Sequence, residues 1–509
     1  MRRREALILG GITALALLLR LVALTHWIDA PGDGVVYAKV ADDWARSPYL
    51  PIHEIFYNWL PGYVALTGLF GILVPDPWLS TRILNVVLGT CCIPVFFFLV
   101  RNIYGPVVAV FSALFLAVLP LHVALSATSM PEVSIVVEIL AGTALFIRAA
   151  GATKNQGLYL IFAIASLVLA MMTRWETWLL IPLFPSYYFL KTRNARTAAW
   201  ILIVLVALPA ACVVSSYRTS GDLTHQISAL FTGSRDTPVM WMGTFARGLV
   251  ALGRIAVRDL GLLALAAVWG TVVQIRKTLS NEVTLEGSLH LWLALIFWPL
   301  IVYMAAVRGY TDHRGLLFVF VIVLPFTIVP IIRHPMMEKR WLIAALTVVA
   351  LASIGVGNLR SMLEAESGYR SPLDVTRVRP TEITNLAHWL AASPYRDDAV
   401  LMTALVYDGG QWHEDWTGSY LWLYFPANLR HRLYIISSMT QDADVQSFVA
   451  RYRPTLFIGY VGEEKLKRAV PDRWAKTFTQ TRVEAVLKTH LTKVVRTEGS
   501  RQVYLIATK

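Results

Sequence analysis

The 509-residue chain is 56% hydrophobic and only 16% charged, with a mean hydropathy of +0.55, whereas soluble domains are about 25% charged. This composition excludes an ordinary soluble enzyme and indicates a polytopic membrane protein. The 46 Lys and Arg residues outnumber the 33 Asp and Glu residues, but they form short clusters between apolar runs. Such clusters are typical of cytoplasmic loops, so no nucleic-acid partner is expected.

Because a bilayer core of about 30 Å requires about 20 apolar residues in a helix, the sequence predicts about eleven transmembrane helices. The predicted spans are 6–25, 82–100, 106–125, 132–148, 158–173, 177–190, 198–216, 258–275, 289–307, 315–332 and 341–358. A further apolar stretch, 57–74, is short and is interrupted by Pro61, Gly62 and Gly71. It either crosses the membrane or lies in the interface.

The basic loops favour the interfacial alternative. If 57–74 does not cross, the N-terminal "MRRRE" and the basic loops all fall on the cytoplasmic side, as the positive-inside rule requires. These loops are 101–105, 148–156, 191–198, 274–278 and 333–340. We therefore expect a protein of the inner cell membrane with a cytoplasmic N-terminus and a periplasmic or extracellular C-terminus.

The composition changes to that of a soluble domain near residue 375. Predicted strands at 398–407, 431–438, 454–461 and 501–508 alternate with predicted helices at 380–392 and 442–452, and the segment 485–496 is expected to pair with the last strand. This order favours an α/β layer with a partly parallel sheet. We expect a transmembrane domain over 1–358 and a soluble outer-face domain over 375–509.

The first outer loop, 26–58, contains an amphipathic helix preceded by an aspartate. Val36, Val40 and Trp44 recur at helical spacing, which suits a helix lying on the membrane surface. Asp33 stands just ahead of it. The spacing alone favours a helix cap for Asp33, so a catalytic role requires further support.

That support is a family resemblance. A first transmembrane helix followed by "PGDGVVYAKVADDW", "FYNWLPGYVALTGLFG" and "DPWLSTRILNVVLGT" resembles the N-terminal module of the GT-C membrane glycosyltransferases. The branch it is most similar to holds protein O-mannosyltransferases and lipid A aminoarabinose transferases, and the likeness covers residues 1–335. Residues that match the family's motifs are Asp33, Pro61, Tyr63, Arg82, Glu132 in "SATSMPEV" and Arg314 in "YTDHRGLLFVFVIVLPF". The family's acidic pair is reduced to "DG", and Asn58 replaces a basic residue of some members.

The resemblance implies an inverting glycosyltransferase that moves a sugar from a polyprenyl-phosphate donor to an acceptor hydroxyl at the outer face. Such a reaction requires a carboxylate that takes the acceptor proton, for which Asp33 is the candidate, with Glu132 as a second catalytic residue. Positively charged donors would stabilise the departing phosphate. The main candidates are Arg174, His313 and Arg314. Arg82 is a weaker candidate, because an arginine at the start of a helix is often only an anchor. Tyr37, Tyr57, Tyr63 and Glu176 are the candidate substrate-binding residues.

The sequence leaves several alternatives open. The sequence indicates no certain cofactor; a divalent metal is possible at His53 and Glu54, where a loop kink is the simpler interpretation. A transporter or flippase of lipid-linked sugars would also have intramembrane charges, but it predicts repeated halves, and the chain has no detectable repeat. An oligosaccharide-transferring relative would have a "W-W-D" motif, which "GGQWHEDWTGSY" (409–420) does not match. A non-catalytic scaffold is the last alternative. The acceptor, whether protein, lipid or glycan, is not specified.

Overall fold

The structure is a computed structural model of the 509-residue chain. It describes residues 3–26, 32–46, 60–74, 76–220, 263–299, 313–332, 380–403, 405–408, 411–414, 432–436, 453–460, 491–498 and 501–506, with isolated positions in 250–261, 301, 348–352, 429 and 446–451. Within these ranges the side chains of Asp33, Asp43 and His313, among others, are outside the described set.

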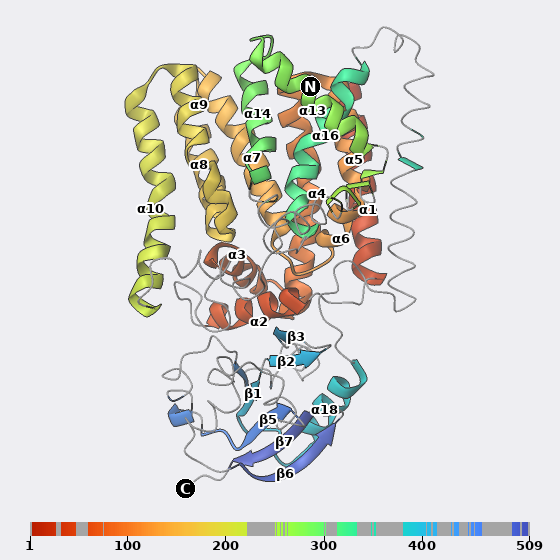
Figure 1. Ribbon diagram of the computed structural model, residues 1–509, viewed down its shortest axis with the longest axis vertical. Coiled ribbons are helices and arrows are strands. Elements are labelled where there is room, and N and C mark those ends of the chain that lie inside the picture. The colour runs from red at the N-terminus through yellow and green to blue at the C-terminus, as the bar shows by residue number, and fades with distance from the viewer. Residues whose placement is uncertain are drawn as a thin grey trace.

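Long helices form a bundle that occupies the upper part of the molecule in Figure 1. The bundle comprises α1 (Arg3–His26), α4 (Pro77–Tyr104), α5 (Pro106–Val118), α6 (Pro120–Ser126), α7 (Glu132–Gly151), α8 (Gln156–Thr173), α9 (Leu183–Thr192), α10 (Ala195–Ser220), α13 (Leu263–Leu279), α14 (Leu285–Leu295) and α16 (Leu317–Ile332). Two short 3₁₀ helices, η1 (Trp175–Leu180) and η2 (His313–Leu316), precede α9 and α16.

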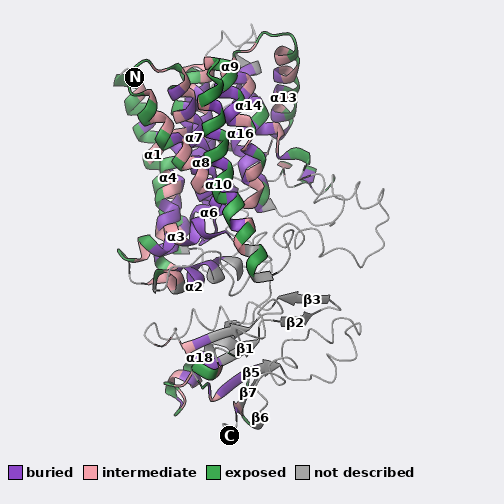
Figure 2. Ribbon diagram, turned by 90° about the vertical axis from the view of Figure 1, so that its left-hand side faces the viewer, coloured by how far each residue is buried: buried purple, intermediate pink, exposed green. Residues whose placement is uncertain are grey.

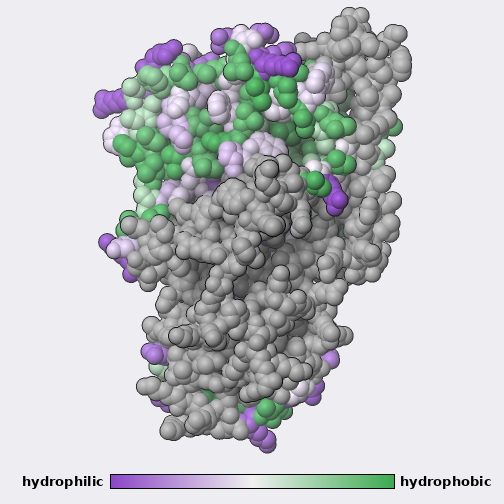
Figure 3. Space-filling view, viewed as in Figure 1, coloured by the Kyte–Doolittle hydropathy of each residue, from purple (hydrophilic) through white to green (hydrophobic). Residues whose placement is uncertain are grey.

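The outside of the bundle is apolar. In the most apolar windows of α1 and α10 only 28% of the residues are buried, against 72% in α7, and Figure 2 shows exposed residues along the outer faces of α1 and α10. The exposed side chains include Leu7, Leu18, Trp200 and Ile203. In Figure 3 hydrophobic residues cover the described face of the bundle and hydrophilic residues line its upper rim. An apolar exterior of this extent is expected when the surrounding solvent is lipid.

Among the described residues, five helices are long and apolar enough to cross a membrane. They correspond to α1, α4, α7, α8 and α10, and each overlaps a predicted span. The protein is therefore an integral membrane protein. The count of about eleven spans stays a prediction, because the last predicted span, 341–358, lies almost wholly outside the described residues.

Two predicted spans differ from a single straight helix. The span 106–125 is divided at Leu119 into α5 and α6, which meet at an angle of 58°. Pro120 begins α6 and has no N–H with which to continue the hydrogen bonding of α5, so the chain breaks there. The span 177–190 is divided between η1 and α9.

Two short helices, α2 (Gly32–Arg46) and α3 (Pro61–Gly71), lie across the end of the bundle that faces the strands (Figure 1). The 11 residues of α3 extend over only about 16 Å at 1.5 Å per residue, which is too short to cross a bilayer. The described part of this stretch, 60–74, therefore contains no helix long enough to cross the membrane. α4 follows directly, with Asp76 as its N-cap accepting a 2.8 Å hydrogen bond from the Leu79 N–H and with Pro77 in its first turn.

The described strands form a five-stranded mixed sheet in the order β4-β1-β5-β7-β6. Their bounds are β1 (Val400–Thr403), β4 (Leu433–Ile436), β5 (Leu456–Tyr460), β6 (Leu491–Glu498) and β7 (Arg501–Ile506). β1 is parallel to β4 and β5, and β7 is antiparallel to β5 and β6. A separate hairpin joins β2 (Leu405–Asp408) to β3 (Gln411–Glu414).

Helix α18 (Pro380–Ala392) contributes to the hydrophobic core of the sheet. Ala38 of α2 belongs to the same hydrophobic cluster as Leu386 and Leu390 of α18, and Trp78 packs against that cluster. The predicted helix 442–452 lies mostly outside the described residues, so the complete α/β domain and its boundaries stay predictions.

Candidate functional site

A turn formed by residues 127–131 connects α6 to α7 and is held by side chains of α4. The amide of Asn85 donates through Nδ2 to the carbonyl oxygens of Thr128 and Met130, each at 2.7 Å. The same Nδ2 lies 3.0 Å from the hydroxyl of Tyr63. Asn85 is fully buried, and buried carbonyls are costly to leave unpaired. One amide thus holds the turn and α3 together.

The first turn of α2 packs directly on this 127–131 turn. A Cβ atom at Gly34 would lie 3.5 Å from both Sδ of Met130 and Cβ of Ser129. Ser129 is itself held by a 2.6 Å hydrogen bond between its hydroxyl and that of Thr81. Because α2 begins at Gly32, the backbone of Asp33 lies in this first turn, rather than ahead of the helix as the sequence predicts. The contact brings Asp33 beside the entrance to α7.

Glu132 is the first residue of α7 and is 5% exposed. Its Oε1 lies 3.4 Å from Nη1 of Arg174, the residue that follows α8. Arg174 also binds the carboxylate of Glu176, with Nε 3.1 Å from each oxygen and Nη2 donating to Oε1. The structure therefore brings together three predicted site residues from α7, the α8 end and η1.

The Glu132–Arg174–Glu176 cluster has two carboxylates and one guanidinium. Burial lowers the pKa of Arg174, but the adjacent Glu176 and Glu132 raise it more, so that its pKa lies above its usual value. Arg174 therefore remains protonated. Two carboxyl groups thus share one guanidinium. Arg174 is therefore better suited to orienting the two carboxyl groups than to binding a phosphate.

Two predicted substrate-binding tyrosines pack against each other next to this cluster. The rings of Tyr37 in α2 and Tyr63 in α3 meet edge to face, with centroids 5.3 Å apart. Both side chains are buried. Burial raises the pKa of the Tyr63 hydroxyl well above its usual value, so this group is neutral at physiological pH and can only act as a hydrogen-bonding group.

The predicted phosphate-binding arginines occupy different surroundings. Arg314, in η2, is 6% exposed and its Nη1 lies 3.6 Å from Sδ of Met130. Arg82 donates to the carbonyl oxygens of Ala127 (2.7 Å) and Leu24 (2.9 Å), and it stacks on Trp78. The described contacts of Arg82 are those of an anchor between α1, α4 and the 127–131 turn, whereas Arg314 reaches the side of that turn on which Gly34 packs.

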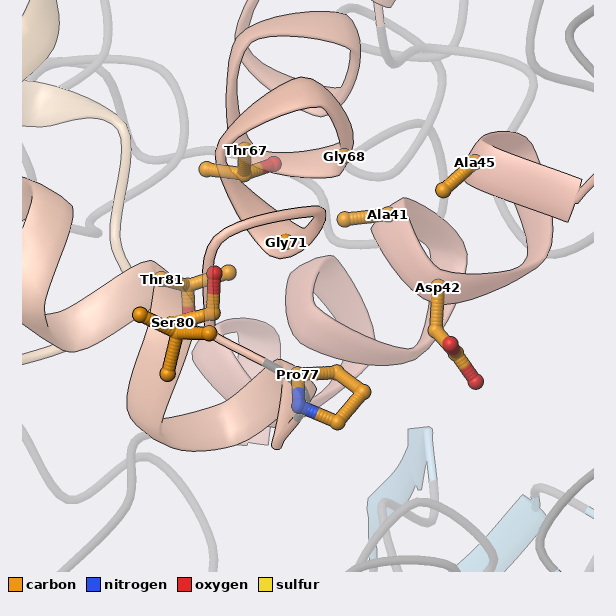
Figure 4. Close-up of a pocket in the computed structure, with 10 residues that line it drawn as sticks. Ala41, Asp42, Ala45, Thr67, Gly68, Gly71, Pro77, Ser80 and Thr81 are labelled. Atoms are coloured by element: carbon orange, nitrogen blue, oxygen red, sulfur yellow. The ribbon is translucent and has the colours of Figure 1, made fainter.

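A pocket lies between α2, α3 and the start of α4 (Figure 4). It is lined mainly by small side chains, including Ala41, Gly68 and Ser80. Asp42 also lines it, but in Figure 4 its carboxylate points away from Ser80.

Glu138 is a further acidic residue close to this end of α7. It is 5% exposed, and its carboxylate accepts a hydrogen bond from Ser134. A carboxyl group within an apolar span is recognisable from the sequence, and Glu138 lies about 1.7 turns beyond Glu132 along α7. Asn85 had a weaker signal, a single amide within an apolar run.

Some predicted residues lie outside the described part of the chain. These are Tyr57, His53, Glu54, Asn58, Asp415 and the side chains of Asp33, His313 and Glu414. Among the described residues, no group of three or more His, Cys, Asp and Glu side chains is placed to hold a metal ion. Glu132 and Glu176 instead converge on Arg174.

Comparisons with known proteins agree with the family resemblance. Residues 61–217 match the family model described as dolichyl-phosphate-mannose-protein mannosyltransferase. No curated protein sequence matches the chain.

The fold is similar to that of solved membrane glycosyltransferases. ArnT from Cupriavidus metallidurans bound to undecaprenyl phosphate has 14% identity and a TM-score of 0.58, with 97% of each chain covered. The oligosaccharyltransferase AglB from Archaeoglobus fulgidus, in complex with an inhibitory peptide and a dolichol-phosphate, has 12% identity and a TM-score of 0.57, with 94% of this chain and 72% of that chain covered. At these identities the likeness establishes the fold. The matched family and the structural neighbours are GT-C enzymes, so the predicted GT-C resemblance is confirmed.

Proposed function

We propose that this protein is an inverting, polyprenyl-phosphate-sugar-dependent glycosyltransferase that acts on an acceptor hydroxyl at the outer membrane face. The observation that carries the proposal is the packing of Gly34 on Ser129 and Met130. It places the first turn of α2, with Asp33, next to the turn that leads into Glu132. The GT-C fold and the polyprenyl phosphates bound by two structural neighbours support the choice of donor.

Asp33 is the proposed general base. As the acceptor oxygen forms a bond to the anomeric carbon, the O–H bond of the acceptor breaks and its proton passes to the Asp33 carboxylate. The bond from the anomeric carbon to the phosphate oxygen breaks at the same time, and polyprenyl phosphate departs with the electron pair. A base and a leaving group on opposite faces of the sugar give inversion.

Glu132 and Glu176 are proposed to orient the substrate, because their carboxyl groups are held in fixed positions. Both converge on Arg174, which holds their oxygens in place without protonating them. Carboxylates at this position accept hydrogen bonds from the hydroxyls of a sugar or an acceptor. Tyr37 and Tyr63, which pack on each other beside the cluster, complete the proposed substrate-binding surface.

Arg314 is the proposed main contact of the donor phosphate. Its Nη1 lies 3.6 Å from Sδ of Met130, in the turn on which the first turn of α2 packs through Gly34. A guanidinium in a water-poor cleft stabilises the growing charge of the departing phosphate better than it would in bulk water. His313 precedes Arg314 in the chain and is proposed to assist it.

The position of this site suits a lipid-linked donor. α2 and α3 lie across one end of the apolar bundle (Figure 1), where the headgroup of a lipid meets water. We propose that this end faces the periplasm or the exterior, with the N-terminus of α1 in the cytoplasm. The strands lie beyond α2 (Figure 1), and the soluble domain, proposed to extend over 375–509, would then cover the site or recruit the acceptor.

Turnover of a labelled donor tests the proposal. Purified protein in lipid nanodiscs is incubated with radiolabelled polyprenyl-phosphate sugars and with protein, lipid and glycan acceptors separately. We expect label to leave the lipid and to appear on one class of acceptor with an inverted anomeric configuration. Movement of intact labelled lipid between leaflets of a proteoliposome, with no loss of its sugar, would instead identify a flippase.

A further inference from the structure

A second arginine lies inside the bundle, away from the carboxylate cluster. The side chain of Arg20, in α1, is fully buried. Its Nε lies 3.2 Å from the hydroxyl of Ser126, its Nη1 donates to the carbonyl oxygens of Ala16 (2.8 Å) and Ala117 (3.3 Å), and its Nη2 donates to Nδ1 of His122. A charged side chain in an apolar span is expensive, and such residues usually serve a function.

The bonding of Arg20 explains how its charge is accommodated. Since arginine is only a donor, Nδ1 of His122 must accept, and the imidazole is neutral with its proton on Nε2. Ala117 belongs to the last turn of α5, where the chain breaks before Pro120 and carbonyls lose their helical partners. Cations are favourable at the C-terminal end of a helix. Arg20 thus binds the broken end of α5 and two residues of α6 at once.

The neighbouring helix α4 is shaped to admit this guanidinium. A Cβ atom at Gly89 would lie 3.0 Å from Nε of Arg20 and would overlap the hydroxyl of Ser126. Only glycine lets α4 pass so close to both groups. Arg82, about two turns before Gly89 in α4, donates to the carbonyl of Ala127, the residue that directly follows α6.

We propose that Arg20 is a positioning residue: by fastening the α5–α6 break, it sets the angle of α6 and so places the 127–131 turn against Gly34 of α2. The turn is only a few residues beyond the groups that Arg20 binds. A shift of α6 would be passed on to Ser129, Met130 and then Glu132. This inference concerns geometry and holds whichever reaction the site performs.

A disulfide reporter measures that geometry directly. Because a Cβ at position 34 lies 3.5 Å from Cβ of Ser129, within the range of disulfides, the Gly34→Cys, Ser129→Cys pair should form a crosslink on mild oxidation. The reporter is built in a chain whose Cys91, Cys92 and Cys212 are changed to alanine. The rate of crosslinking is measured by mass spectrometry on monodisperse protein, so that misfolded material does not contribute.

Arg20→Met is expected to slow this crosslink about tenfold. Loss of one hydrogen bond from a charged donor changes the equilibrium between the packed and shifted positions of α6 by about that factor or more, and only the packed position forms the crosslink. Arg101→Met is the matched control, because Arg101 joins α4 to α1 as well, through Glu5 at the far end of the bundle. It should leave the rate unchanged. Should Arg20→Met fail to fold, Ser126→Ala removes one acceptor only and is expected to slow the reaction severalfold.

A wild-type crosslinking rate in folded Arg20→Met, or in Ser126→Ala if Arg20→Met does not fold, would overturn the proposal and leave Arg20 with a role in stability alone. Equal slowing by Arg101→Met would also overturn it, because any weakened α1–α4 packing would then have the same effect. If Arg20→Met lost sugar transfer but crosslinked at the wild-type rate, Arg20 would act on the reaction of the proposed function in some other way, and its positioning role would be wrong.

Discussion

Nη1 of Arg174 lies 3.4 Å from Oε1 of Glu132, although 42 positions separate them in the chain. The Glu132 side chain is 6% exposed and that of Arg174 is 30% exposed. Removal of one partner of a buried pair leaves the other as an uncompensated charge. Arg174 is therefore expected to matter for stability as well as for activity.

Arg174→Gln is expected to lower the free energy of unfolding by about 3 kcal/mol, the lower end for a broken buried pair, because Arg174 is partly exposed. Sugar transfer should be lost with it. Thermal unfolding in detergent measures the first effect. Adding Glu132→Gln should restore part of the stability, since the remaining Glu176 is more exposed.

Arg148→Gln is the control for this change. Arg148, near the other end of α7, stacks on the ring of Tyr159 at 4.8 Å, and such a contact contributes about 1 kcal/mol or less at an exposed site. We expect near-normal stability and activity. If Arg148→Gln lost as much stability and activity as Arg174→Gln, the Glu132–Arg174–Glu176 cluster would have no special importance.

Gly62 is required for the close approach of α3 to the end of α8. A Cβ atom there would lie 2.6 Å from the carbonyl carbon of Met172 and 2.9 Å from the nitrogen of Thr173. Backbone atoms cannot move aside as a flexible side chain can. Gly62→Ala is expected to lower the free energy of unfolding by about 1–3 kcal/mol, measured by thermal unfolding.

Gly157→Ala is the matched control because it makes the same change in an open position. Nothing lies within 4 Å of a Cβ at Gly157, near the start of α8. Alanine is a better helix former by about 1 kcal/mol, so this variant should be as stable as wild type or more so. A Gly62→Ala protein as stable as Gly157→Ala would contradict the packing described here.

Arg314 and Arg82 are expected to affect the reaction differently. Arg314→Gln should raise the KM for the donor about tenfold or more, because a charge-assisted hydrogen bond to phosphate would be lost. Arg82→Gln should chiefly lower stability, since the carbonyls of Ala127 and Leu24 lose their donor. Donor KM and thermal unfolding are measured for both. An unchanged KM in Arg314→Gln would exclude Arg314 as the phosphate contact.

Local patterns in the sequence were sufficient to find the apolar helices and the short helix at 61–71. Length and hydropathy identify α1, α4, α7, α8 and α10, and Pro61 with its following glycines indicated that this stretch is interrupted. Hydropathy does not predict the break at Leu119, because 106–125 is almost entirely apolar; Pro120 is the one local signal for it. Strand order was not predictable, since β1 pairs with strands that follow much later in the chain.

The arrangement of the site could not be predicted from the sequence, because it depends on contacts between segments that are far apart in the chain. Glu132, Arg174 and Glu176 were each recognisable as ionisable groups at the membrane edge, but their convergence depends on how α7 packs against α8. The sequence assigns no role to Arg20 or Asn85, because a single polar residue in an apolar span does not indicate its partner. The groups that Arg20 binds in α6 are more than 100 positions away.

Membrane orientation is testable with reporter fusions. Glu5 and Arg101 form an ion pair, so the start of α1 and the end of α4 lie at the same end of the bundle, away from the strands (Figure 1). The positive-inside rule assigns this basic end to the cytoplasm. Alkaline phosphatase fused after Lys509 should be active, and a fluorescent protein that requires the cytoplasm should be dark there. The reverse result would place the proposed site on the wrong face.

Asp33→Asn tests the proposed base most directly. Asparagine has nearly the same size as aspartate and fits the first turn of α2 (Gly32–Arg46), so folding should be retained, but it cannot take the acceptor proton. General-base catalysis contributes about 10²- to 10⁴-fold, and the rate of transfer should fall by that factor while donor binding is unchanged. Asp42→Asn, a matched change on the same helix whose carboxylate points away from Ser80 (Figure 4), should transfer at the normal rate. If Asp33→Asn stayed within a few-fold of wild type, Asp33 would be a helix-terminal residue and the base would have to be sought among Glu132 and Glu176.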